Sequence, residues 1–123
     1  MTQTNLREHA TGNGKPASDK AIAPSGGGSR GEARADWQPI GYYYNLRGHG
    51  VFEQLLEAPG VSAYTGVFAT VAEVYPPSDK PFMGGAVMTV HNVVPLDGER
   101  VEIRVDAGWP DDIPVRVHLL YWA

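Results

Sequence analysis

The sequence predicts an all-β protein: a small antiparallel β-sandwich or partly open barrel of about five to seven strands, with one short helix and a disordered N-terminal tail. Apolar residues recur with a period of two through most of residues 62–122, and only residues 51–58 show helical spacing. The connections are too short for the crossover helices that parallel strands need. One short helix cannot cover a five-stranded sheet, so either the strands form two packed sheets or a second copy covers the open face.

The N-terminal third, residues 1–36, is predicted to be a flexible Gly/Ser-rich tail. It contains the segment SGGGSRG at residues 25–31, and Leu6 and Ile22 are its only large aliphatic residues. So little apolar surface cannot offset the entropy that a chain loses when it becomes ordered. We therefore expect two parts, a tail at residues 1–36 and a β-sandwich domain at residues 37–123.

The predicted domain begins with an aromatic strand and a helix. Residues 37–46 are rich in Trp and Tyr, which is typical of a strand, and Pro39 suits an edge because proline has no N–H for the ladder. The segment VFEQLLEA, residues 51–58, has its apolar residues at helical spacing and ends before a Pro-Gly pair. We expect one short helix there.

Four more strands are predicted after this helix. They span residues 62–75, 84–94, 100–106 and 115–122, and an Asp97-Gly98 turn of the hairpin type joins the second and third of them. The alternation predicts that one face of each of the last two strands points inward. The inward residues are Val101, Ile103 and Val105 in the first of these strands, and Val115, Val117, Leu119 and Tyr121 in the second.

Composition and charge limit the classes of partner. The chain is 42% hydrophobic and 20% charged, with no run of about 18 apolar residues and no basic-then-apolar start, so we expect a soluble protein without a classical signal peptide. It has no cysteine, which excludes disulfides and Cys-ligated zinc. Residues 37–123 carry five Lys or Arg and ten Asp or Glu, a net charge of −5, so nucleic acid is not expected as a partner. Because the chain has no long apolar run, a membrane is not expected as a partner either.

An acidic stretch near the C-terminus is a weak candidate for a calcium site. Asp106, Asp111 and Asp112 supply hard oxygen donors, but their spacing lacks the alternating ligands of an EF-hand loop. The sequence favours a different interpretation, in which Gly108 and Trp109-Pro110 form a rigid turn with a charged rim. No cofactor is expected.

Three histidines are candidates for ligand or proton-exchange groups. His49 lies between two glycines, which allow the backbone to bring it close to a ligand, although an ordinary turn explains the same residues. His91 and His118 occupy the polar phases of their strands. They form a metal-binding or proton-exchange pair only if those strands are neighbours.

Aromatic residues are the strongest sequence signal for recognition. Tyr42, Tyr43 and Tyr44 follow one another, so they must point to both faces of a strand, and Trp109 and Trp122 lie in a loop and at a strand end. These five rings are predicted to supply an aromatic binding surface for a glycan, a Pro-rich peptide or a subunit. In the last strand, the side chains that point away from the core change from polar, at Arg116 and His118, to apolar, at Leu120 and Trp122. This change is typical of a strand that a neighbour covers over half of its length.

The sequence contains no recognisable catalytic constellation. Ser62 and Ser78 are the only serines outside the predicted tail, and neither lies in a G-x-S-x-G segment. A domain of this size buries so little apolar surface that its core alone gives only marginal stability. We therefore expect a non-enzymatic β-sandwich interaction or structural module that acts through homo-oligomeric or larger assembly. The alternative is a small-ligand or carbohydrate-binding domain that uses the exposed aromatic rings. A small β-barrel enzyme with His91 or His118 as acid or base is the least favoured hypothesis.

Overall fold

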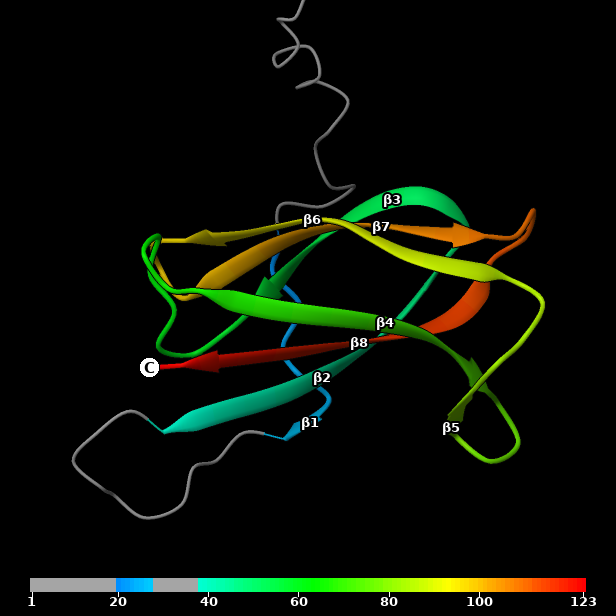
Figure 1. Cartoon of the computed structure of the whole chain (residues 1–123), viewed down its shortest axis with the longest axis horizontal. Helices are drawn as coiled ribbons and strands as arrows, with labels where there is room; N and C mark the ends of the chain where they lie inside the picture. Colours follow the sequence, from blue (N-terminus) through cyan, green and yellow to red (C-terminus); the bar gives the residue numbers. More distant parts are fainter. Residues whose placement is uncertain (1–19, 28–37) are drawn as a thin grey trace, which may run out of the picture.

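The computed structural model describes residues 20–27 and 38–123, and within them it confirms the predicted all-β class (Figure 1). The strands form two packed antiparallel sheets, and no described residue is helical. Among the described residues, no helix is long and apolar enough to cross a membrane. The strands are β1 (Gly26–Gly27), β2 (Pro39–Gly48), β3 (Gly50–Glu57), β4 (Val67–Tyr75), β5 (Lys80–Phe82), β6 (Val87–Leu96), β7 (Arg100–Gly108) and β8 (Ile113–Trp122).

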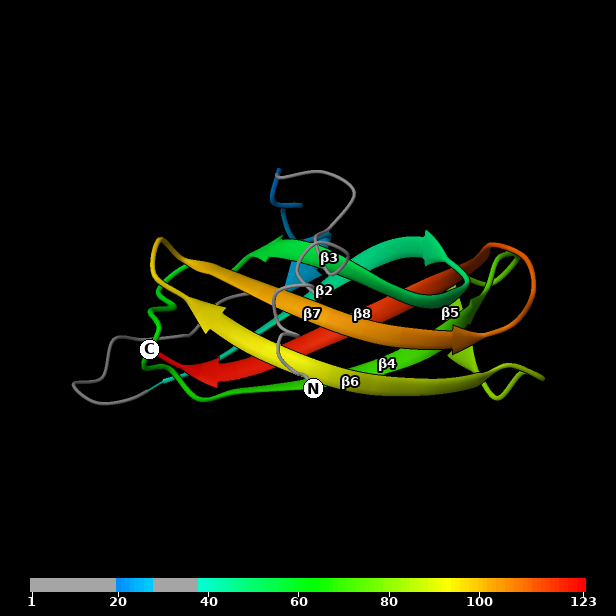
Figure 2. The same ribbon diagram turned by 90° about the horizontal axis from the view of Figure 1, so that it is seen from above.

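One sheet has five strands in the order β1-β2-β8-β4-β5, and the other has three in the order β3-β7-β6. Figure 2 shows β3, β7 and β6 lying across β2, β8 and β4. The connections from β2 to β3 and from β7 to β8 pass between the sheets at the same end, because β2 pairs with β8 and β3 pairs with β7. The two connections therefore lie close together although they are far apart in the sequence.

The predicted helix at residues 51–58 is wrong, because strand β3 occupies this segment. It pairs with β7 along its whole length, from Gly50 opposite Ala107 to Glu57 opposite Arg100. Leu55 and Leu56 point to opposite faces and are both buried. A strand that buries apolar residues on both faces can have the same residue spacing as an amphipathic helix, and only its long-range pairing distinguishes the two.

The core lies between the two sheets, and it contains the residues of β7 and β8 that were predicted to point inward. None of the seven predicted residues in these two strands is more than 1% exposed. Tyr44 of β2 is also fully buried, and its hydroxyl donates a hydrogen bond of 2.6 Å to the Glu57 carbonyl oxygen at the end of β3. Burial, with a smaller contribution from the neighbouring Tyr121, raises the pKa of the Tyr44 hydroxyl well above its ordinary value.

Residues 20–27 contact the edges of both sheets. The Ile22 N–H donates to the Leu55 carbonyl of β3 at 2.9 Å, and the Glu57 N–H donates to the Ile22 carbonyl at 2.8 Å. Further along, β1 pairs with β2 opposite Tyr42 and Tyr43. This part of the predicted tail therefore belongs to the packed body, while the remainder of residues 1–36, and Trp37, lie outside the described residues.

Candidate functional site

The structure separates the three consecutive tyrosines of β2. Tyr44 has no exposed surface, so it is not accessible to a ligand. Tyr42 is half-buried against the core and stacks on Tyr121, with ring centroids 6.4 Å apart. Only Tyr43 lies on the opposite side of the sheet, where it is also half-buried. Of the three tyrosines predicted to form an aromatic surface, Tyr43 alone lies on the face that points away from the core.

The two tryptophans of the predicted aromatic surface lie at opposite ends of β8. Trp109 is in the connection that precedes the strand, next to Gly85, and Trp122 is the last residue of the strand. A ten-residue strand is about 30 Å long. The Trp109 loop and Trp122 therefore do not contribute to one site.

The acidic stretch joins the neighbouring connection between the sheets. Asp112 lies 2.5 Å from Nδ1 of His49, so two residues predicted independently as site candidates are in contact. Asp106 lies within β7, paired with Val51 on one side and Thr89 on the other. In the described part of the chain, no three His, Asp or Glu side chains are placed to hold a metal ion. Of the three aspartates, Asp111 and Asp112 lie in the connection between β7 and β8.

The two strand histidines are not neighbours. His91 lies at a β-bulge in β6, in the three-stranded sheet, and His118 lies in β8, in the five-stranded sheet. The condition for a metal-binding or proton-exchange pair is therefore not met.

We call the side chains of β2, β8 and β4 that point away from the three-stranded sheet the outer face. They form cross-strand rows. From the C-terminal end of β8 the rows are Pro39–Trp122, Gly41–Leu120–Phe68, Tyr43–His118–Thr70 and Asn45–Arg116–Ala72. The change from polar to apolar residues that the sequence showed along β8 therefore extends across three strands.

The polar end of the outer face is organised around Arg116, which is 7% exposed. Its Nε donates to Oδ1 of Asn45 at 2.8 Å, and its Nη2 pairs with Oδ1 of Asp79 at 2.8 Å. The guanidinium also lies over the Tyr43 ring, 4.7 Å from the centroid. These partners occupy the donors and the flat surface of the guanidinium, so we interpret the cluster as structural.

His118 lies beside this cluster, and desolvation together with the positive charge of Arg116 lowers its pKa below the ordinary value of 6.5. The unfolded chain therefore binds a proton at this residue at a higher pH than the folded chain. We expect the free energy of unfolding to fall as the pH decreases below about 6.5, and His118→Gln to reduce that fall. Urea unfolding between about pH 7.5 and pH 5 measures it, with the exposed-bulge variant His91→Gln as control. An identical pH dependence in wild type and His118→Gln would contradict the expectation.

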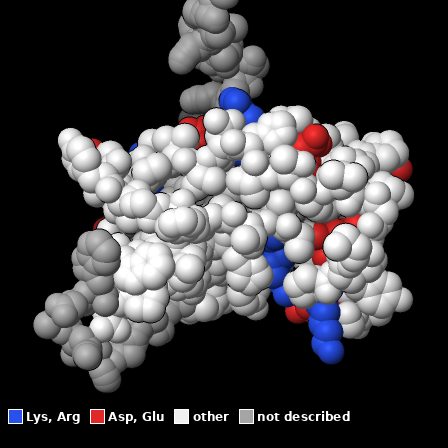
Figure 3. Space-filling model, viewed as in Figure 1, with Lys and Arg blue, Asp and Glu red and all other residues white. Residues whose placement is uncertain are grey.

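The other end of the outer face is an apolar patch, which we define as Phe68, Leu120 and Trp122. Their exposed fractions are 65%, 43% and 37%, and the Phe68 and Trp122 rings meet edge to face with centroids 6.4 Å apart. The cross-strand rows that contain these three residues hold no Lys, Arg, Asp or Glu. Figure 3 shows charged side chains gathered toward β5. The sequence indicated Leu120 and Trp122 but missed Phe68, which joins them only through the pairing of β4 with β8.

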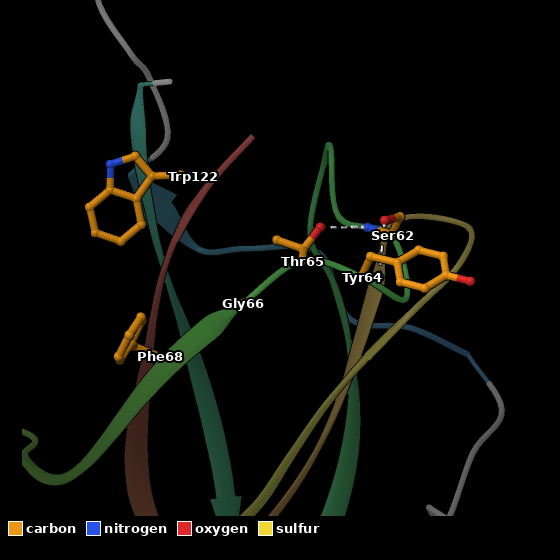
Figure 4. A pocket seen from close by; sticks show the side chains of 6 residues that line it. All are labelled: Ser62, Tyr64, Thr65, Gly66, Phe68 and Trp122. Atoms are coloured by element: carbon orange, nitrogen blue, oxygen red, sulfur yellow. Dashed lines mark hydrogen bonds between the residues drawn. The ribbon is translucent and has the colours of Figure 1, made fainter. Parts of the chain in front are cut away.

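A pocket of about 510 Å³ borders the apolar patch. In Figure 4, Phe68 and Trp122 lie on one side of it and Ser62 and Thr65 on the other, while the Tyr64 ring points away from the two aromatic rings. The pocket is open, and its lining is mostly aromatic and hydroxyl-bearing. The complete lining is Ser62, Tyr64, Thr65, Gly66, Phe68 and Trp122.

The loop between β3 and β4, residues 58–66, is held in place by the turn between β6 and β7. The Ala58 N–H donates to the Glu99 carbonyl at 2.9 Å, the Gly60 N–H to the Glu99 carboxylate at 3.0 Å, and the Ala63 N–H to the Asp97 carboxylate at 3.0 Å. The predicted Asp97-Gly98 turn is present, with Gly98 at a φ of 90°. The rim of the pocket is therefore preorganised by backbone hydrogen bonds.

The chain matches no protein-family model, no curated protein and no solved structure. Exposed aromatic and aliphatic side chains that lie together without charge favour the burial of another apolar surface, because each square ångström removed from water contributes about 25 cal/mol. Of the surfaces described above, the apolar patch with its preorganised rim is the best candidate for a binding site.

Proposed function

We propose that this protein is a non-enzymatic interaction module that associates with a second copy of itself through the apolar patch. The observation that carries the proposal is the continuity of Phe68, Leu120 and Trp122 across two paired strands, all partly open to water. In a domain with so small a core, covering these side chains stabilises the folded state as well as the assembly.

The charge distribution supports a second copy as the partner. Residues 37–123 carry a net charge of −5, so most orientations of two copies bring like charges together. The first three rows of the outer face contain no Lys, Arg, Asp or Glu. Two copies that meet through these rows avoid like-charge contacts at the interface.

The shape of the surface favours a protein interface over a small-ligand site. The pocket ends at Phe68 and Trp122, but the apolar surface continues past it to Leu120 on β8. The uncharged part of the outer face spans three strands that are about 4.8 Å apart and three rows that are about 6.8 Å apart, so it measures about 15 by 20 Å. This is smaller than the interface of a standard stable complex, which buries about 800 Å² per partner, so we expect reversible association.

Leu120→Lys should abolish this association, because it places a charge in the centre of the apolar patch on both copies. We expect the wild-type mass, measured by sedimentation equilibrium, to rise from monomer toward dimer with concentration, while the variant stays monomeric. Val87→Lys is the matched control, since Val87 is an exposed apolar residue (71%) in the other sheet, and it should associate like wild type.

A wild-type protein that stays monomeric at the highest soluble concentration would rule the proposal out, as would an equal loss of association in both lysine variants. If that monomer changed its tryptophan fluorescence on addition of a neutral oligosaccharide, the ligand-binding alternative would replace it.

A further inference from the structure

We infer that the two copies meet face to face about a two-fold axis parallel to β8, so that Phe68 of each copy fills a hollow over Gly41 of the other. This inference rests on the proposed self-association and adds the arrangement of the two copies.

The hollow and the ring that would fill it lie in one row of the outer face. Gly41 of β2, Leu120 of β8 and Phe68 of β4 are directly paired neighbours. A methyl group built on Gly41 would contact only the Leu119 carbonyl oxygen, at 3.8 Å, so no described side chain lies within 4 Å of that position. Phe68, on the other side of Leu120, is 65% exposed. The row therefore presents a hollow, a central side chain and a protruding ring.

A two-fold axis along β8 exchanges the two sides of this row. Neighbouring strands are about 4.8 Å apart, so Gly41 and Phe68 lie at nearly equal distances from β8. Rotation about an axis that runs parallel to β8 in the interface places Phe68 of one copy over Gly41 of the second, and Leu120 against Leu120. Each row keeps its level along the strand, so uncharged rows face uncharged rows.

An axis perpendicular to β8 in the plane of the interface gives poorer packing. Centred on Leu120, it places Phe68 against Phe68 and Gly41 against Gly41, which sets ring on ring and leaves an empty space between the glycines. Centred on His118, it places Leu120 against the row that contains Arg116. Complementary shape and matched polarity occur together only with the parallel axis.

The absence of native cysteines allows a direct test by cross-linking. Pro39 pairs with Trp122 on the β2 side, and Gly66 directly precedes Val67 of β4, which pairs with Tyr121 on the other side of β8. Neither residue takes part in the Gly41–Phe68 contact. We would mix Pro39→Cys and Gly66→Cys proteins, treat them with a short bis-maleimide reagent, and identify the products by mass spectrometry. The parallel axis predicts that the mixed pair predominates over either homodimer.

The outcomes separate the arrangement from the association itself. If the mixed sample is dimeric by sedimentation but cross-links no better between the variants than within either one, the arrangement is overturned and the self-association stands. If the sample is monomeric, both fail.

A second variant tests the hollow. Gly41→Leu should raise the dimer dissociation constant at least roughly ten-fold because its side chain occupies the space of the partner's ring. Val87→Leu adds bulk to an exposed residue of the other sheet and should leave the dissociation constant near the wild-type value. Gly41 has no positive φ, and circular dichroism reports whether each variant is folded. Unchanged association of folded Gly41→Leu would overturn the inference.

Discussion

Tyr121→Ala is expected to lower the free energy of unfolding by about 3–5 kcal/mol, among the largest effects of any single substitution in this protein. Tyr121 is fully buried in β8 and stacks on Tyr42, and its hydroxyl donates to the Pro59 carbonyl at 2.7 Å. Alanine removes the ring, leaves a cavity between the sheets and breaks the link to the β3–β4 loop. Urea denaturation followed by circular dichroism measures the change.

Two further variants divide this effect into its parts. Tyr121→Phe keeps the ring and removes only the hydroxyl, so it should cost about 1–2 kcal/mol. Tyr64→Ala is the control for the loss of an aromatic side chain, because Tyr64 is 95% exposed, and it should change stability by no more than about 0.5 kcal/mol. If Tyr121→Ala were no more destabilising than Tyr64→Ala, the described core would be incorrect.

Arg116→Ala is expected to cost about 2–3 kcal/mol, because one substitution removes the contacts with Asn45, Asp79 and the Tyr43 ring. The estimate is below that for a fully buried ion pair, since the Asp79 side chain is 75% exposed and water solvates it once Arg116 is gone. Arg116→Lys keeps the charge but cannot reach Asn45 and Asp79 with one planar group, so we expect an intermediate loss. The same denaturation experiment measures both.

The matched controls for Arg116 are on the same face of the sheet and in the same ion pair. Arg47→Ala removes an exposed arginine from β2 and should cost no more than about 0.5 kcal/mol. Asp79→Ala removes only the exposed partner and should cost no more than about 1 kcal/mol. Equal losses for Arg116→Ala and Arg47→Ala would show that the cluster does not contribute to stability.

The residues of β7 and β8 that point into the core were predictable, because the sequence of each strand alone shows which alternate residues are apolar. A period of two places alternate residues on opposite faces, whatever the strand pairs with. The same logic failed for residues 51–58, where apolar residues point to both sides of β3 and the spacing resembles a helix. It also failed to separate Tyr44, which is buried, from the rest of the aromatic run.

The candidate site was only partly predictable for a related reason. Leu120 and Trp122 were found from the change of character along β8, a property of one segment. Phe68 and Gly41 belong to β4 and β2, which both precede β8 by many residues in the sequence, and they join Leu120 in one row only because those strands pair with β8 on its two sides. His49 and Asp112 likewise meet because two connections between the sheets lie at the same end.

The sequence by itself determined the all-β class, the lack of any disulfide, the acidic charge of residues 37–123 and the side of β7 and β8 that faces the core. These follow from composition and local alternation. Only the tertiary structure decided that residues 50–57 form a strand, that residues 20–27 contact both sheets and which side chains form the apolar patch. Strand register depends on contacts between residues distant in the chain, and a shift of one residue would turn each side chain to the other face.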